Sequence, residues 1–144
     1  MAIRYFTENS PIPKQIKKRI LNEWVKEIID KHEKVLGDIS FIFCNKKTII
    51  KLNRDYLQHD YLTDILTFEY SVGTHLSGDL YICPEAVKSN SQKFKTNCTE
   101  ELFRVMIHGV LHLCGINDKS EEEKLEMNTE ENNALEILRT KLIF

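Results

Sequence analysis

The run ISFIFC at residues 39–44 decides the fold class, because β-branched and aromatic residues dominate it and favour a strand. Two similar runs, ILTFEY at 65–70 and DLYIC at 79–83, predict further strands, and Ile3 and Tyr5 alternate with polar residues as in a short strand. With the helical stretches between them, the order is β-α-β-α-β-β-α-α-α. The sequence therefore predicts an α+β fold, in which a small mixed sheet of about four strands packs against about five helices.

The helices are predicted from apolar spacing and from residues that favour helix ends. The first is a long helix opened by Pro11 and Pro13, and its apolar positions repeat with the period of one buried stripe. These positions are Ile16, Ile20, Leu21, Trp24, Val25, Ile28 and Ile29. The other helices are predicted over roughly 46–55, from Pro84, from a cap at Thr99 to a stop at Gly115, and over 121–141 with Leu125, Leu135, Leu138 and Leu142.

The composition predicts one ordinary globular domain over residues 1–144. Hydrophobic residues make up 42% and charged residues 29%, which excludes a disordered or fibrous chain. Lys and Arg number 20 against 22 for Asp and Glu, a net charge of −2. The chain is therefore not a general polyanion binder, and any contact with nucleic acid must come from a local patch.

Cysteine usage and hydropathy predict a reduced, cytoplasmic protein without a membrane segment. Cys44, Cys83, Cys98 and Cys114 form no C-x-x-C pair. Three of the four follow apolar runs, where a thiol is usually a small core side chain. No stretch approaches about 18 apolar residues, and MAIRYFTENS at the N-terminus has no signal-peptide core.

The candidate metal site lies in HGVLHLCGIND, residues 108–118, near the end of a helix. His108 and His112 are four residues apart, so both imidazoles leave one helix face and suit two ligands of a single zinc ion per chain. Gly115 allows a sharp turn, after which Asp118 is placed to be the third ligand. Three protein ligands leave one position open, as in catalytic zinc sites. The alternative for Asp118 is a cap on the last helix.

Gly109 bears on both the packing and the chemistry of this site. A glycine within a helix costs about 0.5–1 kcal/mol relative to alanine, so we expect a packing or functional reason for it. Zinc peptidases of the H-E-x-x-H type carry a glutamate at this position as general base. Its replacement by glycine here disfavours peptide hydrolysis.

Several blocks together resemble the YbeY endoribonucleases, the bacterial rRNA maturation factors. LNRDYLQHDYLTDILTF at 52–68 is similar to the family pattern LNxxYRxxDxPTDVLSF, and GDLYICPE at 78–85 is similar to GDIxIcxE. HGVLHLCGIND at 108–118 is similar to HGxLHLxGxDH, and Met127 and Glu131 stand where the last helix of the family tends to carry Met and Glu. The blocks follow the family order over roughly residues 40–135.

The resemblance implies a mixed α/β sheet fold, one zinc ion held by three ligands, and cleavage of single-stranded RNA in late small-subunit rRNA maturation. It also implies ribosomal RNA and small-subunit proteins as partners, in the cytoplasm. His108 and His112 match the first two family ligands, and the third, normally histidine, is Asp118 here, preceded by Asn117 in place of aspartate. A carboxylate binds zinc at about 2.0–2.2 Å, so ligation is retained in principle.

The sharpest departure from the family follows Tyr56. The family has a Tyr-Arg pair where this chain has Tyr56-Leu57, and the resemblance gives that arginine a role in catalysis or RNA binding. Arg54, three residues before Leu57, and Arg104, one turn before His108, are the candidate catalytic residues that replace it. The alternative for each is an ordinary surface role.

The favoured function is a metal-dependent, single-strand-specific endoribonuclease, with Lys46, Lys47, Lys51 and Arg54 tracking the RNA backbone. Two alternatives stay open. One is a metal hydrolase with another substrate, because His-His-Asp also resembles a 2-His-1-carboxylate iron site. The other is a non-catalytic, zinc-stapled ribosome assembly factor, which the missing arginine favours.

Overall fold

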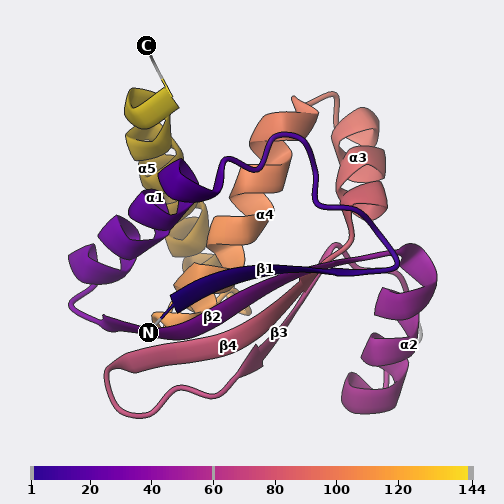
Figure 1. Cartoon of the computed structure of the whole chain (residues 1–144), viewed down its shortest axis with the longest axis horizontal. Coiled ribbons are helices and arrows are strands. Elements are labelled where there is room, and N and C mark those ends of the chain that lie inside the picture. Colours follow the sequence, from indigo (N-terminus) through magenta and orange to yellow (C-terminus); the bar gives the residue numbers. More distant parts are fainter. Residues whose placement is uncertain (1, 60, 143–144) are drawn as a thin grey trace.

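A computed structural model describes residues 2–59 and 61–142, so Asp60 of the block at 52–68 lies outside the described residues. The chain forms a four-stranded sheet of order β1-β2-β4-β3 (Figure 1). β1 (Ala2–Glu8) and β4 (His75–Ile82) are both parallel to β2 (Val35–Cys44), whereas β3 (Ile65–Glu69) is an edge strand antiparallel to β4. The predicted α+β class and the predicted order of elements are confirmed.

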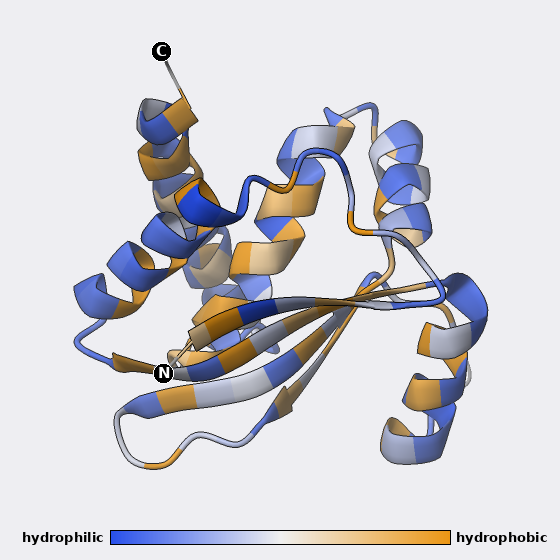
Figure 2. Ribbon diagram, in the orientation of Figure 1, coloured by the Kyte–Doolittle hydropathy of each residue, from blue (hydrophilic) through white to orange (hydrophobic). Residues whose placement is uncertain are grey.

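Helices cover both faces of the sheet (Figure 1). α1 (Lys18–Lys31), α4 (Cys98–Leu113) and α5 (Glu121–Leu142) share one large core with β2 and β4, and α3 (Pro84–Lys93) packs beside α4. α2 (Lys46–Leu57) closes a smaller core on the opposite face. Figure 2 shows α4 hydrophobic along much of its length, as expected of the central helix. In the part of the chain that the structure describes, no helix combines the length and apolar character needed to cross a bilayer.

Gly109 explains how closely α4 approaches the sheet. A Cβ atom at this position would lie 2.2 Å from Leu80 Cδ2 and 2.8 Å from Ile65 Cδ1, which is overlap rather than contact. The packing reason expected for this glycine is therefore present: a side chain here would displace Leu80 and Ile65, whereas glycine lets α4 lie directly against β3 and β4. His108 and His112 are thereby held beside the edge strand β3.

α5 is fixed against α1 by a buried tryptophan. Trp24 is fully buried, and its indole N–H donates a 2.7 Å hydrogen bond to the carbonyl oxygen of Ala134. Burying so large a side chain with its polar group satisfied contributes several kcal/mol, so this contact sets where the other α5 side chains lie.

Several predicted helix ends and one predicted core residue are wrong. The first helix begins at Lys18 rather than at Pro11 or Pro13, because the prolines lead into a separate turn, which the hydrogen bond from Ile16 N–H to Pro13 O closes at 3.1 Å. The cap of α4 is Asn97, whose side-chain oxygen accepts the Glu100 N–H at 3.0 Å, rather than Thr99; both are good caps, and the earlier one starts the helix. Leu125 is 70% exposed, since α5 turns Met127, Ala134, Leu135 and Leu138 toward the core.

The cysteines that follow apolar runs lie in the core, as predicted. Cys44, Cys83 and Cys114 are buried. Burial raises the pKa of the Cys44 and Cys114 thiols to about 12, so both stay protonated and unreactive near neutral pH.

Candidate metal centre

The end of α4 turns the following loop back over its last residues. Gly115 has φ +98°, a left-handed conformation that suits glycine, and it stops the helix as predicted. The Gly115 N–H donates to His112 O at 3.0 Å, and the Ile116 N–H donates to Leu111 O at 3.0 Å, so the last carbonyls of the helix are satisfied. The chain that leaves this turn brings Asp118 back to the two histidines.

Three side chains converge on one point at this turn. His108 Nε2 lies 3.0 Å from His112 Nε2, and Asp118 Oδ2 lies 3.4 Å from each of these nitrogens. Tetrahedral ligands at about 2.0–2.2 Å from one zinc ion stand roughly 3.3–3.5 Å apart. The two separations from Asp118 Oδ2, both 3.4 Å, match this spacing, and the 3.0 Å between the histidine nitrogens is slightly shorter, so a small outward shift of the two rings fits all three ligands to a shared ion. Within residues 2–59 and 61–142, this is the only group of three potential ligands so close together. The predicted triad can therefore hold one metal ion.

The alternative role of Asp118, a cap on α5, is filled by another residue. Ser120 Oγ accepts the Glu123 N–H at 3.1 Å, and a Glu123 carboxylate oxygen accepts the Ser120 N–H at 2.9 Å. This reciprocal pair is a capping box. It leaves the Asp118 carboxylate directed at the two histidines.

His108 and His112 line a hollow of about 590 Å³. β3 forms one wall with Ile65, Thr67 and Glu69, and the end of α4 with the loop at 117–119 forms another. The side chains of the triad are 24–37% exposed, which leaves room for a fourth, non-protein ligand. The two metal histidines thus lie in a hollow between an edge strand and a helix end.

The carboxylates around His108 favour the charged form of its imidazole. Burial, the largest single influence, disfavours the charged imidazole. The hydrogen bond to Glu131 and the charges of Glu131, Asp118 and Asp64 together outweigh burial and raise the pKa of His108. Asp64 lines the same hollow, and its own burial raises the pKa of its carboxyl.

Metal binding should weaken as the pH falls. A ligand imidazole must be deprotonated to bind a metal ion, and the raised pKa of His108 means that protons compete from a higher pH than for an ordinary imidazole. In the metal-free protein, the raised pKa of His108 stabilises the folded state at pH values below the unfolded pKa of about 6.5. This stabilisation is lost as the pH rises through the pKa of the folded state. Both effects make the difference in stability between zinc-loaded and metal-free protein larger at higher pH.

The rise in Tm on adding one equivalent of Zn²⁺ should therefore be larger at pH 7.5 than at pH 6.0, as measured by differential scanning fluorimetry. An equal rise at both pH values would contradict the participation of a titrating histidine.

The two candidate arginines have different surroundings. Arg54 is exposed and forms an ion pair with Asp55 at 3.3 Å. Leu57, not Arg54, lines the hollow beside the triad. Arg104 lies one turn before His108, as predicted, and pairs with Glu131 at 2.9 Å. A catalytic role for either arginine stays a prediction.

Sequence reasoning missed the contact between Glu131 and His108. The resemblance marked Glu131 as a family position, but a residue 23 positions away on another helix shows no periodic relation to His108. Glu131 Oε2 accepts the His108 Nδ1–H at 2.7 Å. The position of Asp64 in the same hollow as His108 was likewise not predictable from spacing, because Asp64 was marked only as part of the block at 52–68.

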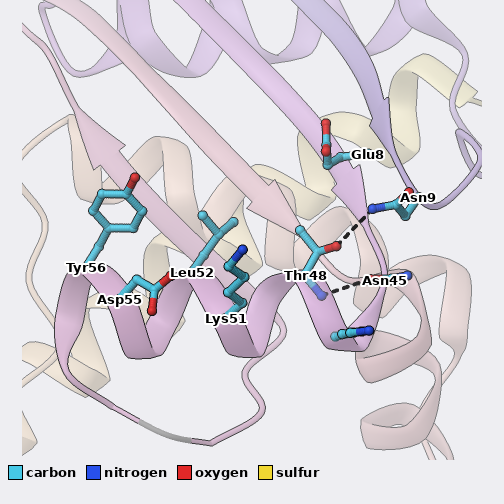
Figure 3. A pocket seen from close by; sticks show the side chains of 9 residues that line it. Glu8, Asn9, Asn45, Thr48, Lys51, Leu52, Asp55 and Tyr56 are labelled. Carbon is cyan, nitrogen blue, oxygen red and sulfur yellow. Dashed lines mark hydrogen bonds between the residues drawn. The ribbon is translucent and has the colours of Figure 1, made fainter.

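A larger hollow, of about 670 Å³, lies between the end of β1 and α2 (Figure 3). Thr48 is held there by Asn9 at 3.3 Å and by the cap residue Asn45 at 2.9 Å, so these polar groups support α2. The lining residues include Lys47 and Lys51 but no histidine or cysteine. Metal chemistry is therefore assigned to the smaller hollow, and a role for the lysines in tracking RNA stays a prediction.

Comparison with known proteins gives a consistent result. Residues 5–139 match the family model described as endoribonuclease YbeY. A protein named endoribonuclease YbeY from Bacteroides fragilis is 53% identical over 94% of this chain and 96% of its own. Its namesake from Parabacteroides distasonis is 49% identical over 96% of both chains. The solution structure of TM1509 from Thermotoga maritima shares the fold, with a TM-score of 0.65 and 24% identity over 98% of this chain and 94% of that one.

Proposed function

The chain belongs to the YbeY endoribonuclease family, and on that premise we propose that it is a metal-dependent, single-strand-specific endoribonuclease that acts in late small-subunit rRNA processing. The convergence of His108, His112 and Asp118 beside an open hollow carries this proposal. Zinc is the proposed ion, because two imidazoles and a carboxylate with an open position are a usual catalytic zinc set. Cleavage of RNA that stops on adding a chelator tests it.

The residues of the chain hold the ion and shape its surroundings. His108, His112 and Asp118 would be the three ligands. A zinc ion bound there supplies Lewis acidity, which lowers the pKa of water toward about 7 and polarises a phosphoryl oxygen. The hollow beside β3 gives a phosphodiester access to this point, and Lys119 on its rim supplies a positive charge for the backbone.

The proposed partners are ribosomal RNA and small-subunit proteins, in the cytoplasm. The net charge of −2 argues against free binding to any RNA, because a chain without a general excess of positive charge gains little from non-specific attraction to phosphates. Contacts with proteins of the small ribosomal subunit would instead bring the chain to its RNA substrate.

A second candidate function is a non-catalytic assembly factor. The observation that favours it is Leu57, an apolar side chain on the wall of the hollow at the position where the family carries arginine. In that case the ion would only staple the loop to α4. A metal hydrolase with another substrate stays the third candidate, and metal analysis of protein purified without added metal would test whether iron is bound.

Leu57→Arg should raise RNA cleavage. Leu57 is 45% exposed and lines the same hollow as His108 and His112, so an arginine there has both space and proximity to a bound phosphate. One charge-assisted contact in a transition state is worth about 1.5–3 kcal/mol, or roughly 10- to 100-fold in rate. Single-turnover cleavage of a labelled single-stranded RNA measures the gain.

Val72→Arg is the matched control. Val72 is 79% exposed near the turn between β3 and β4, so this substitution adds the same positive charge away from the hollow. A gain confined to Leu57→Arg supports the endoribonuclease. No gain from Leu57→Arg, with loss from Arg54→Ala, would identify Arg54 as the replacement. No effect from either would favour the assembly factor.

A further inference from the structure

Glu131 of α5 touches the metal centre from outside the ligand set. Among the described residues it is the one carboxylate that counts as buried, with 7% of its surface exposed. Its two oxygens have different partners: Oε2 accepts the His108 Nδ1–H at 2.7 Å, and Oε1 accepts Arg104 Nη1–H at 2.9 Å. A buried carboxylate costs free energy unless it is paired, and here both oxygens are paired.

The contact between Glu131 and Nδ1 decides which ring nitrogen of His108 is free to bind the metal. A neutral imidazole carries one proton, so a proton on Nδ1 leaves a lone pair on Nε2. Nε2 is the atom that lies 3.0 Å from His112 Nε2 and 3.4 Å from Asp118 Oδ2. The hydrogen bond that Glu131 accepts from Nδ1–H therefore selects the tautomer in which the unprotonated nitrogen, Nε2, points at the shared site.

The Arg104 side chain is held by hydrogen bonds to residues of α5. Besides Glu131, its guanidinium donates to Asn132 Oδ1 at 2.7 Å and to Asn128 Oδ1 at 3.5 Å. Glu131 and Asn132 follow Asn128 by three and four residues, so all three partners face Arg104 from one side of α5. The guanidinium is thus held against the helix, where it fixes the orientation of the Glu131 carboxylate.

We propose that Glu131 is a positioning residue of the metal centre, which fixes the tautomer and ring orientation of His108, and that Arg104 acts through Glu131 rather than on a substrate phosphate. The inference rests on the metal centre of the proposed function. Outer partners of this kind contribute about 10- to 100-fold to metal affinity. A purely structural link between α4 and α5 would instead change the stability of the metal-free protein and leave its affinity for zinc unchanged.

The test is the Zn²⁺ affinity of the purified protein, measured by competition with a chromophoric chelator in the absence of RNA. Glu131→Ala should lower the affinity about 10- to 100-fold. Arg104→Gln should lower it in the same direction, whereas an arginine that only contacts phosphate would leave it unchanged. The matched control is Glu130→Gln, because Glu130 is the neighbouring residue on α5 and pairs with His32 at 2.9 Å, in a His–Glu contact outside the metal group.

Unchanged affinity in a folded Glu131→Ala protein would overturn the positioning role while leaving the metal centre intact. A wild-type protein that binds no zinc would overturn the centre and this role together. Ring-nitrogen NMR of metal-free wild-type protein at pH 8 gives a second readout that needs no variant. It should show His108 protonated at Nδ1, and protonation at Nε2 would refute the proposal even if Glu131→Ala failed to fold.

Discussion

Replacing either metal histidine by alanine should abolish tight binding of Zn²⁺ and the thermal stabilisation that the metal confers. Each imidazole supplies one of three converging ligand atoms, and two protein ligands do not form a stable zinc site. A metal at 100 times its Kd stabilises the folded state by about 2.7 kcal/mol, so the rise in Tm on adding zinc should be lost. Metal analysis after dialysis and differential scanning fluorimetry measure the two effects.

The two histidine variants should differ in the absence of metal. His108→Ala also removes the partner of buried Glu131, which costs about 1–3 kcal/mol beyond the loss of the ring. His75→Ala is the matched control, because His75 is exposed at the start of β4. Full metal content and a wild-type melting curve in either His108→Ala or His112→Ala would show that the site is wrong.

Asp118→Ala should weaken zinc binding by orders of magnitude and change the stability of the metal-free protein little. The reason is that Asp118 Oδ2 lies 3.4 Å from both imidazole nitrogens, whereas Ser120 supplies the cap of α5. Ser120→Ala should do the reverse: it should cost about 0.5–2 kcal/mol of stability and leave zinc binding intact. Normal metal occupancy in Asp118→Ala would remove Asp118 from the ligand set.

Asp118→His should keep the metal and move the pH profile of activity to lower pH. Histidine at this position restores the residue that the family usually carries, and it replaces a negative ligand by a neutral one. A bound ion with less negative ligands is more positive and makes its water more acidic. A profile unchanged between wild type and Asp118→His, measured over pH 5.5–9, would contradict this account.

The fold was predictable because its elements depend on local patterns. Strand-favouring runs such as 39–44 and the helical spacing from Ile20 to Ile29 follow from propensity and periodicity. Helix starts were less predictable, since the choice between Asn97 and Thr99 depends on where the chain leaves the preceding turn rather than on cap preference. The exposure of Leu125 likewise depends on how α5 packs.

The metal ligands were predictable for a similar reason. His108 and His112 are one turn apart, and Asp118 follows a glycine turn, so all three lie within one local segment. The contacts of Glu131 and the place of Leu57 on the wall of the hollow depend on the docking of α5 and α2 against the rest of the fold. Such long-range packing has no signature in the spacing of a single sequence.

Cleavage of a labelled single-stranded RNA by freshly purified protein, with and without a chelator, tests the central claim most directly. The account predicts cleavage by the wild-type protein, loss of cleavage on chelation, recovery when Zn²⁺ is added back, and no cleavage by His108→Ala at any zinc concentration. His75→Ala should cleave like the wild type. Undiminished cleavage by His108→Ala, or by chelated wild-type protein shown by metal analysis to hold no metal, would contradict a metal-dependent endoribonuclease.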